Sequence, residues 1–114
     1  MKTRRKVSWI KAARKSFNKF PDAVQTQAAS ALTIASQGQK ADIAKPLTGF
    51  VDPVFEIVLK HRGDAYRVIY AVKIGDDLWV VHAFQKKSNR GIKTPQKEID
   101  TIKERINRLK EALR

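Results

Sequence analysis

The feature that most constrains this chain is a block of alternating apolar residues that starts at Phe55 and ends at Phe84. Every second position in two successive segments is apolar: Phe55, Ile57 and Leu59 in the first, and Tyr66, Val68, Tyr70 and Val72 in the second. A third run, residues 78–84, is rich in β-branched and aromatic side chains. Turns at residues 61–64 and 75–77 separate the runs, and each contains glycine. Because turns this short connect antiparallel neighbours, the block predicts a three-stranded meander.

The segments on either side of this block have helical periodicity instead. Residues 11–20 predict a short helix, and residues 22–37 predict a longer one, so together they predict a helical hairpin. After the meander, Thr94 and Pro95 suit an N-cap and a first helical position. The helix they introduce carries apolar residues at spacings of three and four, which form one stripe. That stripe consists of Ile99, Ile102, Ile106, Leu109 and Leu113.

The whole chain of 114 residues is interpreted as one α+β domain, because a single core of this size is normal. Residues 7–10 predict a short strand at an edge of the meander. Residues 40–53 contain two prolines and a glycine without periodicity, and they are interpreted as a linker. The predicted order is β-α-α-β-β-β-α, with a small antiparallel sheet, an N-terminal helical hairpin on one face and a C-terminal helix.

Charge points to a polyanionic partner. Lysine and arginine number 24 against 11 aspartates and glutamates, so the net charge is +13. The first 20 residues hold eight basic side chains and no acidic one. Such a field attracts nucleic acid above all, and also acidic proteins or anionic membranes. The apolar runs are far shorter than the roughly 20 residues of a membrane span, so we expect a soluble cytoplasmic protein with no membrane partner.

Several kinds of functional site are excluded because the residues they require are missing from the sequence. The chain has no cysteine, which excludes disulfides and thiolate metal sites. It has no glycine-rich phosphate loop followed by lysine, and its two histidines, His61 and His82, do not have metal-site spacing. The acidic residues are not clustered as a metal-dependent nuclease would require. We therefore expect no metal and no cofactor.

Basic residues on and beside the meander are the remaining candidates for chemistry. Arg67 lies in mid-strand, on a face shared with Ala65, Ile69 and Ala71. Two interpretations remain open for it: a structural ion pair, or bidentate contact with a phosphate. The other cations of the set are Lys60, Arg62, Lys86, Lys87, Arg90 and Lys93.

Cations of this kind can support RNA cleavage. RNA supplies its own nucleophile, the ribose 2′-hydroxyl, and the protein must move two protons and stabilise the phosphorane charge. His82 is an acid–base candidate, but alternation places it with Leu78, Val80 and Phe84 on a face that we expect to be buried. Phe84 could stack on a base or pack in the core. Tyr66 and Tyr70 are predicted core residues.

Three stretches resemble the RelE/ParE toxin superfamily, and within it the phage-derived, HigB-like toxins of type II toxin–antitoxin systems. They are Lys45-Pro46-Leu47-Thr48-Gly49, then Phe55-Glu56-Ile57 continuing to Gly63-Asp64-Ala65-Tyr66-Arg67-Val68-Ile69-Tyr70, and His82-Ala83-Phe84-Gln85-Lys86-Lys87-Ser88 with Thr94-Pro95. The resemblance extends from residue 7 to about residue 109. It implies a RelE-like fold and cleavage of mRNA on the ribosome without metal.

The resemblance also implies roles for single residues. Arg67 matches a catalytic strand arginine, and Lys60 matches one of two catalytic lysines, whereas Val58 stands at the place of the other. A family arginine after the last strand is matched by Lys86 or Lys87. We therefore expect Arg67, Lys87 and Lys60 to be catalytic. We expect the RNA-binding residues to be Arg62, Lys86, Arg90 and Lys93.

The implied partners are the ribosome, mRNA and a cognate antitoxin, often a helix-turn-helix protein. Two other functions remain open. Relatives with the same fold inhibit DNA gyrase without cleaving RNA, and the fold alone does not separate them. A basic RNA-binding module without catalysis would also carry this charge.

Overall fold

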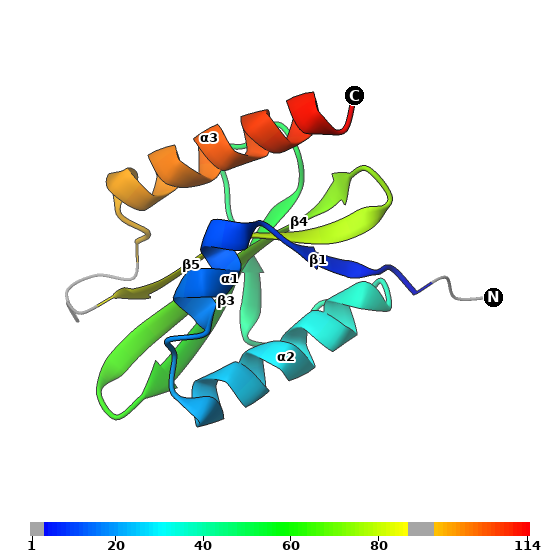
Figure 1. Cartoon of the computed structure of the whole chain (residues 1–114). Coiled ribbons are helices and arrows are strands. Elements are labelled where there is room, and N and C mark those ends of the chain that lie inside the picture. Colours follow the sequence, from blue (N-terminus) through cyan, green and yellow to red (C-terminus); the bar gives the residue numbers. More distant parts are fainter. Residues whose placement is uncertain (1–3, 87–92) are drawn as a thin grey trace.

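The computed structural model describes residues 4–86 and 93–114, and within them the chain forms one five-stranded sheet with helices on both faces (Figure 1). The elements, in chain order, are β1 (Val7–Trp9), α1 (Lys11–Phe17), α2 (Asp22–Ser36), β2 (Ala44–Pro46), β3 (Val54–His61), β4 (Asp64–Ile74), β5 (Asp77–Lys86) and α3 (Gln96–Ala112). The predicted α+β class, helical hairpin and meander are confirmed.

The sheet differs from the prediction at its two edges. Its strand order is β1-β5-β4-β3-β2, so β1 joins the meander as expected, but it runs parallel to β5. At the other edge, three residues of the predicted linker form β2, which pairs antiparallel with β3. A strand this short has no readable periodicity, and Pro46, which has no N–H to donate, is tolerated because β2 is an edge strand.

α1 and α2 pack on one face of the sheet. The core on this face contains Phe17 and Phe20 from the hairpin and Tyr66, Val68 and Tyr70 from β4. The ring centroids of Phe20 and Tyr66 lie 4.9 Å apart in an edge-on arrangement. Tyr66 and Tyr70 are buried, as predicted. Burial raises the pKa of Tyr70 to about 12, which keeps its hydroxyl neutral.

The opposite face is covered by α3, whose Ile102, Ile106 and Leu109 pack on Ile69 and Val81. The predicted stripe therefore covers its own sheet, except that Leu113 at its end is 47% exposed.

A β-bulge corrects the predicted face of His82. Ile69 pairs with His82, whereas the next residue, Tyr70, pairs with Val80, so Val81 is the extra residue in β5. Leu78 and Val80 consequently face the hairpin, and His82 and Phe84 lie on the α3 face. The prediction that all four share a face was wrong. The prediction that His82 is buried is confirmed, with 6% of it exposed.

The helix ends also differ slightly from the prediction. α1 ends at Phe17 rather than at Phe20, because the backbone N–H groups of Lys19 and Phe20 bond to carbonyls three residues earlier, as in a turn. Phe20 also precedes Pro21, which disfavours helical conformation at Phe20. α3 begins at Gln96, with Pro95 rather than Thr94 as its N-cap. The Pro95 carbonyl accepts hydrogen bonds from the backbone N–H groups of Glu98 and Ile99. The Thr94 hydroxyl is thus available for another contact.

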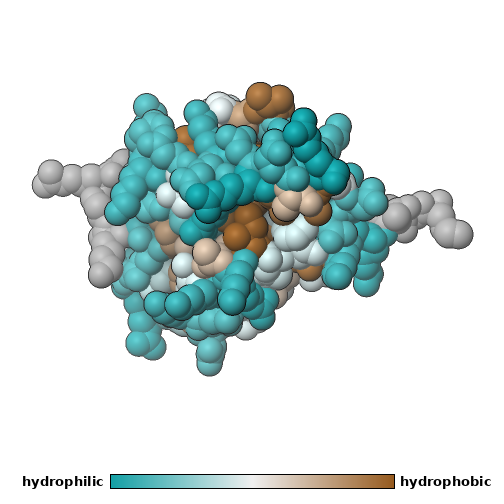
Figure 2. Space-filling model, turned by 45° about the horizontal axis from the view of Figure 1, so that its top comes forward, coloured by the Kyte–Doolittle hydropathy of each residue, from teal (hydrophilic) through white to brown (hydrophobic). Residues whose placement is uncertain are grey.

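The surface seen in Figure 2 is largely hydrophilic, and its apolar areas are small. The large apolar residues exposed in the described part of the chain are Ile43, Val51 and Leu113. No helix among the described residues is both long enough and apolar enough to cross a membrane.

Candidate functional site

A buried ion pair joins β3 and β4 on the α3 face of the sheet. Glu56 Oε2 lies 2.9 Å from Arg67 Nη1, and the two residues are 1% and 3% exposed. Glu56 pairs with Ile69 across the strands, and Arg67 is two residues from Ile69. Because alternate residues of a strand share a face, both side chains point to the same side. The pair is shielded from water, so its charges interact more strongly than those of an exposed pair.

The Glu56 carboxylate has two further neighbours. The Thr94 hydroxyl donates a hydrogen bond to Oε2, and Lys45 Nζ on β2 lies 3.8 Å from Oε1. The Lys45 side chain is 46% exposed, so this contact is weakened by solvent. The carboxylate therefore connects three strands of the sheet edge with the residue that precedes the N-cap of α3.

Lys86, the last residue of β5, extends this cluster. Its Nζ donates a 2.8 Å hydrogen bond to the carbonyl of Lys93, and the residue is buried. Burial lowers the pKa of Lys86, and the positive charge of Arg67 lowers it further. We call Glu56, Arg67, Lys86, Lys45 and Thr94 the Glu56 cluster. It contains three cationic side chains and one carboxylate, so it has the electrostatic character of an anion site.

The structure brings some of the predicted residues to this cluster and not others. Lys60 of β3 pairs with Ala65, which in turn pairs with Lys86. Lys60 and Lys86 therefore lie about two strand spacings, or about 10 Å, apart on one face. Arg62 lies in the β3–β4 turn with a left-handed φ of 50°, exposed to solvent.

Of the remaining predicted residues, the structure describes Lys93 but not Lys87 or Arg90. Lys93 is exposed and contributes its backbone carbonyl to the cluster rather than a charge. The predicted sites at Lys87 and Arg90 lie outside the described residues.

Sequence reasoning did not select Glu56, Thr94 or Lys45 as site residues. One signal for Glu56 was available: it is a charged residue between Val54 and Val58, on a strand whose other face is apolar. No sequence signal identified Thr94, because its position before a proline indicated a cap. Lys45 was in a predicted linker, where no face could be assigned.

A second polar network lies under α3. His82 Nε2 is 2.7 Å from Glu98 Oε1, and Arg105 Nη1 is 2.9 Å from His82 Nδ1. Since a guanidinium can only donate, Nδ1 accepts, and Nε2 carries the proton donated to Glu98. Burial is the main cause of the lowered pKa of His82, and Arg105 also lowers it while Glu98 opposes the shift. His82 is therefore a satisfied core histidine.

Phe84 stacks on the His82 ring, with centroids 5.2 Å apart, and it is 9% exposed. Of the two interpretations left open for Phe84, core packing fits this position. The structure leaves little of the ring surface accessible to a nucleic-acid base.

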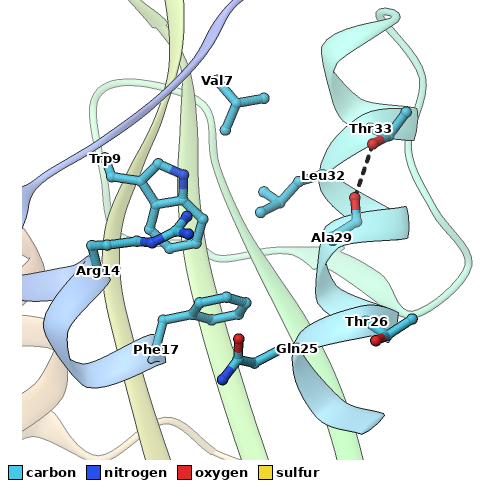
Figure 3. A pocket seen from close by; sticks show the side chains of 9 residues that line it. All are labelled: Val7, Trp9, Arg14, Phe17, Gln25, Thr26, Ala29, Leu32 and Thr33. Atoms are coloured by element: carbon cyan, nitrogen blue, oxygen red, sulfur yellow. Dashed lines mark hydrogen bonds between the residues drawn. The ribbon is translucent and has the colours of Figure 1, made fainter. Parts of the chain in front are cut away.

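A separate hollow of about 420 Å³ lies between β1, α1 and α2. Figure 3 shows Trp9, Phe17 and Leu32 around it, with Gln25 and Thr26 contributed by α2. The Arg14 guanidinium lies 4.7 Å from the centre of the Trp9 ring. The lining contains one cation, so the Glu56 cluster is the better candidate for an anion such as a phosphate.

Solved structures share this fold, and two of them are toxin structures. One is the structure of the Escherichia coli toxin RelE in the free state, carrying two arginine-to-alanine substitutions, with a TM-score of 0.63 and 18% identity over 92% of this chain and 97% of that one. The other is the toxin–antitoxin complex RelBE2 of Mycobacterium tuberculosis, with a TM-score of 0.52 and 16% identity over 77% of this chain and 98% of that one. The fold is thus RelE-like, as the resemblance implied.

The family follows from the sequence itself. Residues 15–107 match the model of the phage-derived Gp49-like proteins (DUF891), so the chain belongs to that family. Among curated proteins, none matches the sequence significantly. Family and fold together make the chain a RelE-like member of the toxin superfamily.

Proposed function

We propose that this protein is the toxin of a type II toxin–antitoxin system and that it cleaves mRNA on the ribosome. The single observation that carries this proposal is the Glu56 cluster, which holds Arg67 and Lys86 on one face of a RelE-type sheet. Cations gathered in a low-dielectric site are what a developing phosphorane charge requires. The RelE fold and the Gp49-like family support the same reaction.

The reaction uses the substrate's own 2′-hydroxyl. Its oxygen attacks the adjacent phosphorus, the bond from phosphorus to the 5′-oxygen breaks, and the products are a 2′,3′-cyclic phosphate and a 5′-hydroxyl. A base takes the 2′ proton and an acid supplies a proton to the 5′-oxygen. Arg67 is proposed to stabilise the phosphorane, and Lys60 and Lys87 to transfer protons or offset charge.

Access is part of the proposal, because Arg67 and Lys86 are both buried. The site must open for a phosphate to reach them.

The RNA backbone or ribosomal RNA is proposed to be held by Arg62, Lys86, Arg90 and Lys93. The cognate antitoxin, proposed to be a helix-turn-helix protein, would then restore growth when it is expressed together with this chain.

The test is induction in growing bacteria, followed by mapping of mRNA 5′ ends by primer extension. We expect new ends in register with codons, on translated messages only, carrying 5′-hydroxyls that need phosphorylation before ligation. Arg108→Ala, which removes an arginine whose side chain is 80% exposed on α3, should produce the same 5′ ends as the wild-type protein. Growth arrest with intact mRNA would replace the proposal with gyrase inhibition. RNA binding without arrest or cleavage would leave a basic binding module.

A further inference from the structure

A buried carboxylate is an unexpected component of a phosphate site, since it repels the anion that the cations attract. Within residues 4–86 and 93–114, Glu56 is the only acidic side chain that is buried. Its burial carries a desolvation cost that has to be offset by its contacts. Its position inside the cluster therefore calls for a role that outweighs the repulsion.

The contacts of Glu56 hold the carboxylate in one orientation. Oε2 accepts a hydrogen bond from the Thr94 hydroxyl and forms the ion pair with Arg67 Nη1, while Lys45 lies on the side of Oε1. The carboxylate is thus fixed by groups from β2, β4 and the segment before α3. A carboxylate held in this way can restrict the orientation of the guanidinium with which it forms an ion pair, because the guanidinium is a rigid planar group and the pair is shielded from water.

We propose that Glu56 is the positioning residue for Arg67. It orients the guanidinium before the substrate arrives, so that Arg67 need not reorganise when the phosphorane charge develops. Preorganised donors stabilise a transition state more than donors that must first be oriented. In a reaction that depends on orientation, this gain exceeds the loss from one nearby negative charge. The inference rests on the proposed nuclease function.

The competing explanation is that Glu56 and Arg67 form a structural ion pair only. Removing the charge of Glu56 would then lower the stability of the protein and the amount that is folded, but it would not act on catalysis through Arg67. The two explanations differ in whether the effect of Glu56 depends on the presence of an arginine at position 67.

A double-mutant cycle measures this dependence with full-length protein on programmed ribosomes. We expect Glu56→Gln, which retains shape and loses charge, to lower the single-turnover cleavage rate per folded molecule about 10- to 100-fold, the size expected of a misplaced catalytic group. In an Arg67→Lys background the same substitution should change the rate less than about twofold, because no guanidinium remains to be oriented. Equal losses in both backgrounds would overturn the proposal.

Two further variants keep the cycle interpretable. Glu98→Gln is the matched control, because it neutralises another carboxylate under α3 that contacts His82 and not Arg67. Any loss that it causes should be the same in both backgrounds. Thr94→Val removes the hydroxyl bound to Glu56 and supplies a second probe if Glu56→Gln does not fold. Its loss should be smaller, and it too should disappear with Arg67→Lys; persistence there would contradict the inference.

A measurement without ribosomes separates failure of this inference from failure of the proposed function. In ¹⁵N NMR spectra, we expect the Arg67 guanidinium of the wild-type protein to rotate slowly about its Cζ–Nε bond and to rotate faster in Glu56→Gln. Equal rotation in both proteins would overturn the positioning role, whatever the enzyme does. A difference in rotation, with no cleavage by the wild-type protein, would retain the orienting contact and reject the nuclease function on which its catalytic meaning rests.

Discussion

The two faces of the sheet are built on different principles. The face under α1 and α2 is an apolar core that includes Phe17, Tyr66 and Leu78. The face under α3 combines an apolar cluster with charged groups: Glu56, Arg67, His82 and Lys86 are all buried there. Burying charged groups is costly unless they are paired, whereas apolar packing stabilises without such conditions. The comparison separates a face built on apolar packing from a face that combines apolar packing with the candidate site.

Removing the arginine of the buried pair should have the largest effect on stability. Arg67→Ala leaves the Glu56 carboxylate buried without this partner, and we expect a loss of about 3–5 kcal/mol in the free energy of unfolding. Denaturant unfolding measures the loss. Adding Glu56→Gln to Arg67→Ala should recover more than half of it, since the neutral amide is cheaper to bury. If the second substitution instead adds a further loss, the charge of Glu56 is not what makes the first one costly.

A conservative change on the hairpin face should have a smaller effect, and on stability alone. Ile57 is fully buried, and Ile57→Val should cost about 0.5–1.5 kcal/mol through lost packing. We expect the cleavage rate per folded molecule to stay within twofold of the wild-type rate, measured as the 5′ ends formed per unit time. A selective loss of cleavage in this variant would contradict the assignment of the candidate site to the α3 face alone.

The smallest expected effect is a pH dependence from the His82 network. Because the folded protein lowers the pKa of His82, the unfolded chain binds a proton more readily. The stabilisation is therefore present above the unfolded pKa of about 6.5 and is lost as the pH falls below it. Unfolding curves recorded from pH 8 to pH 5 should show this decline. His82→Gln should flatten it, and an unchanged slope in that variant would assign the decline to other groups.

Local patterns predicted the elements of the fold well. The alternation from Phe55 to Phe84 gave the meander, and the spacing of three and four gave α3, because side-chain periodicity is a property of each element by itself. The edge strand β2 was missed because three residues carry no period. The β-bulge at Val81 was missed because it depends on pairing with β4, and it moved His82 to the other face.

The candidate site could be predicted only in part. Arg67 was selected as a basic residue within a strand, and the structure shows it bound to Glu56 and near Lys86. The other members of the Glu56 cluster could not be inferred together with Arg67. They come from positions 45, 56, 86 and 94, which no local sequence pattern connects. The catalytic roles of Arg67, Lys60 and Lys87 remain predictions.

By itself, the sequence determined the α+β class, the strongly basic charge and the candidate Arg67, since these depend on composition and local spacing. Only the tertiary structure decided which charges are buried together. The partners of Glu56 come from separate elements, and their strand register and the docking of α3 place them around one carboxylate. Register and docking result from long-range packing, so the site exists only in the folded chain.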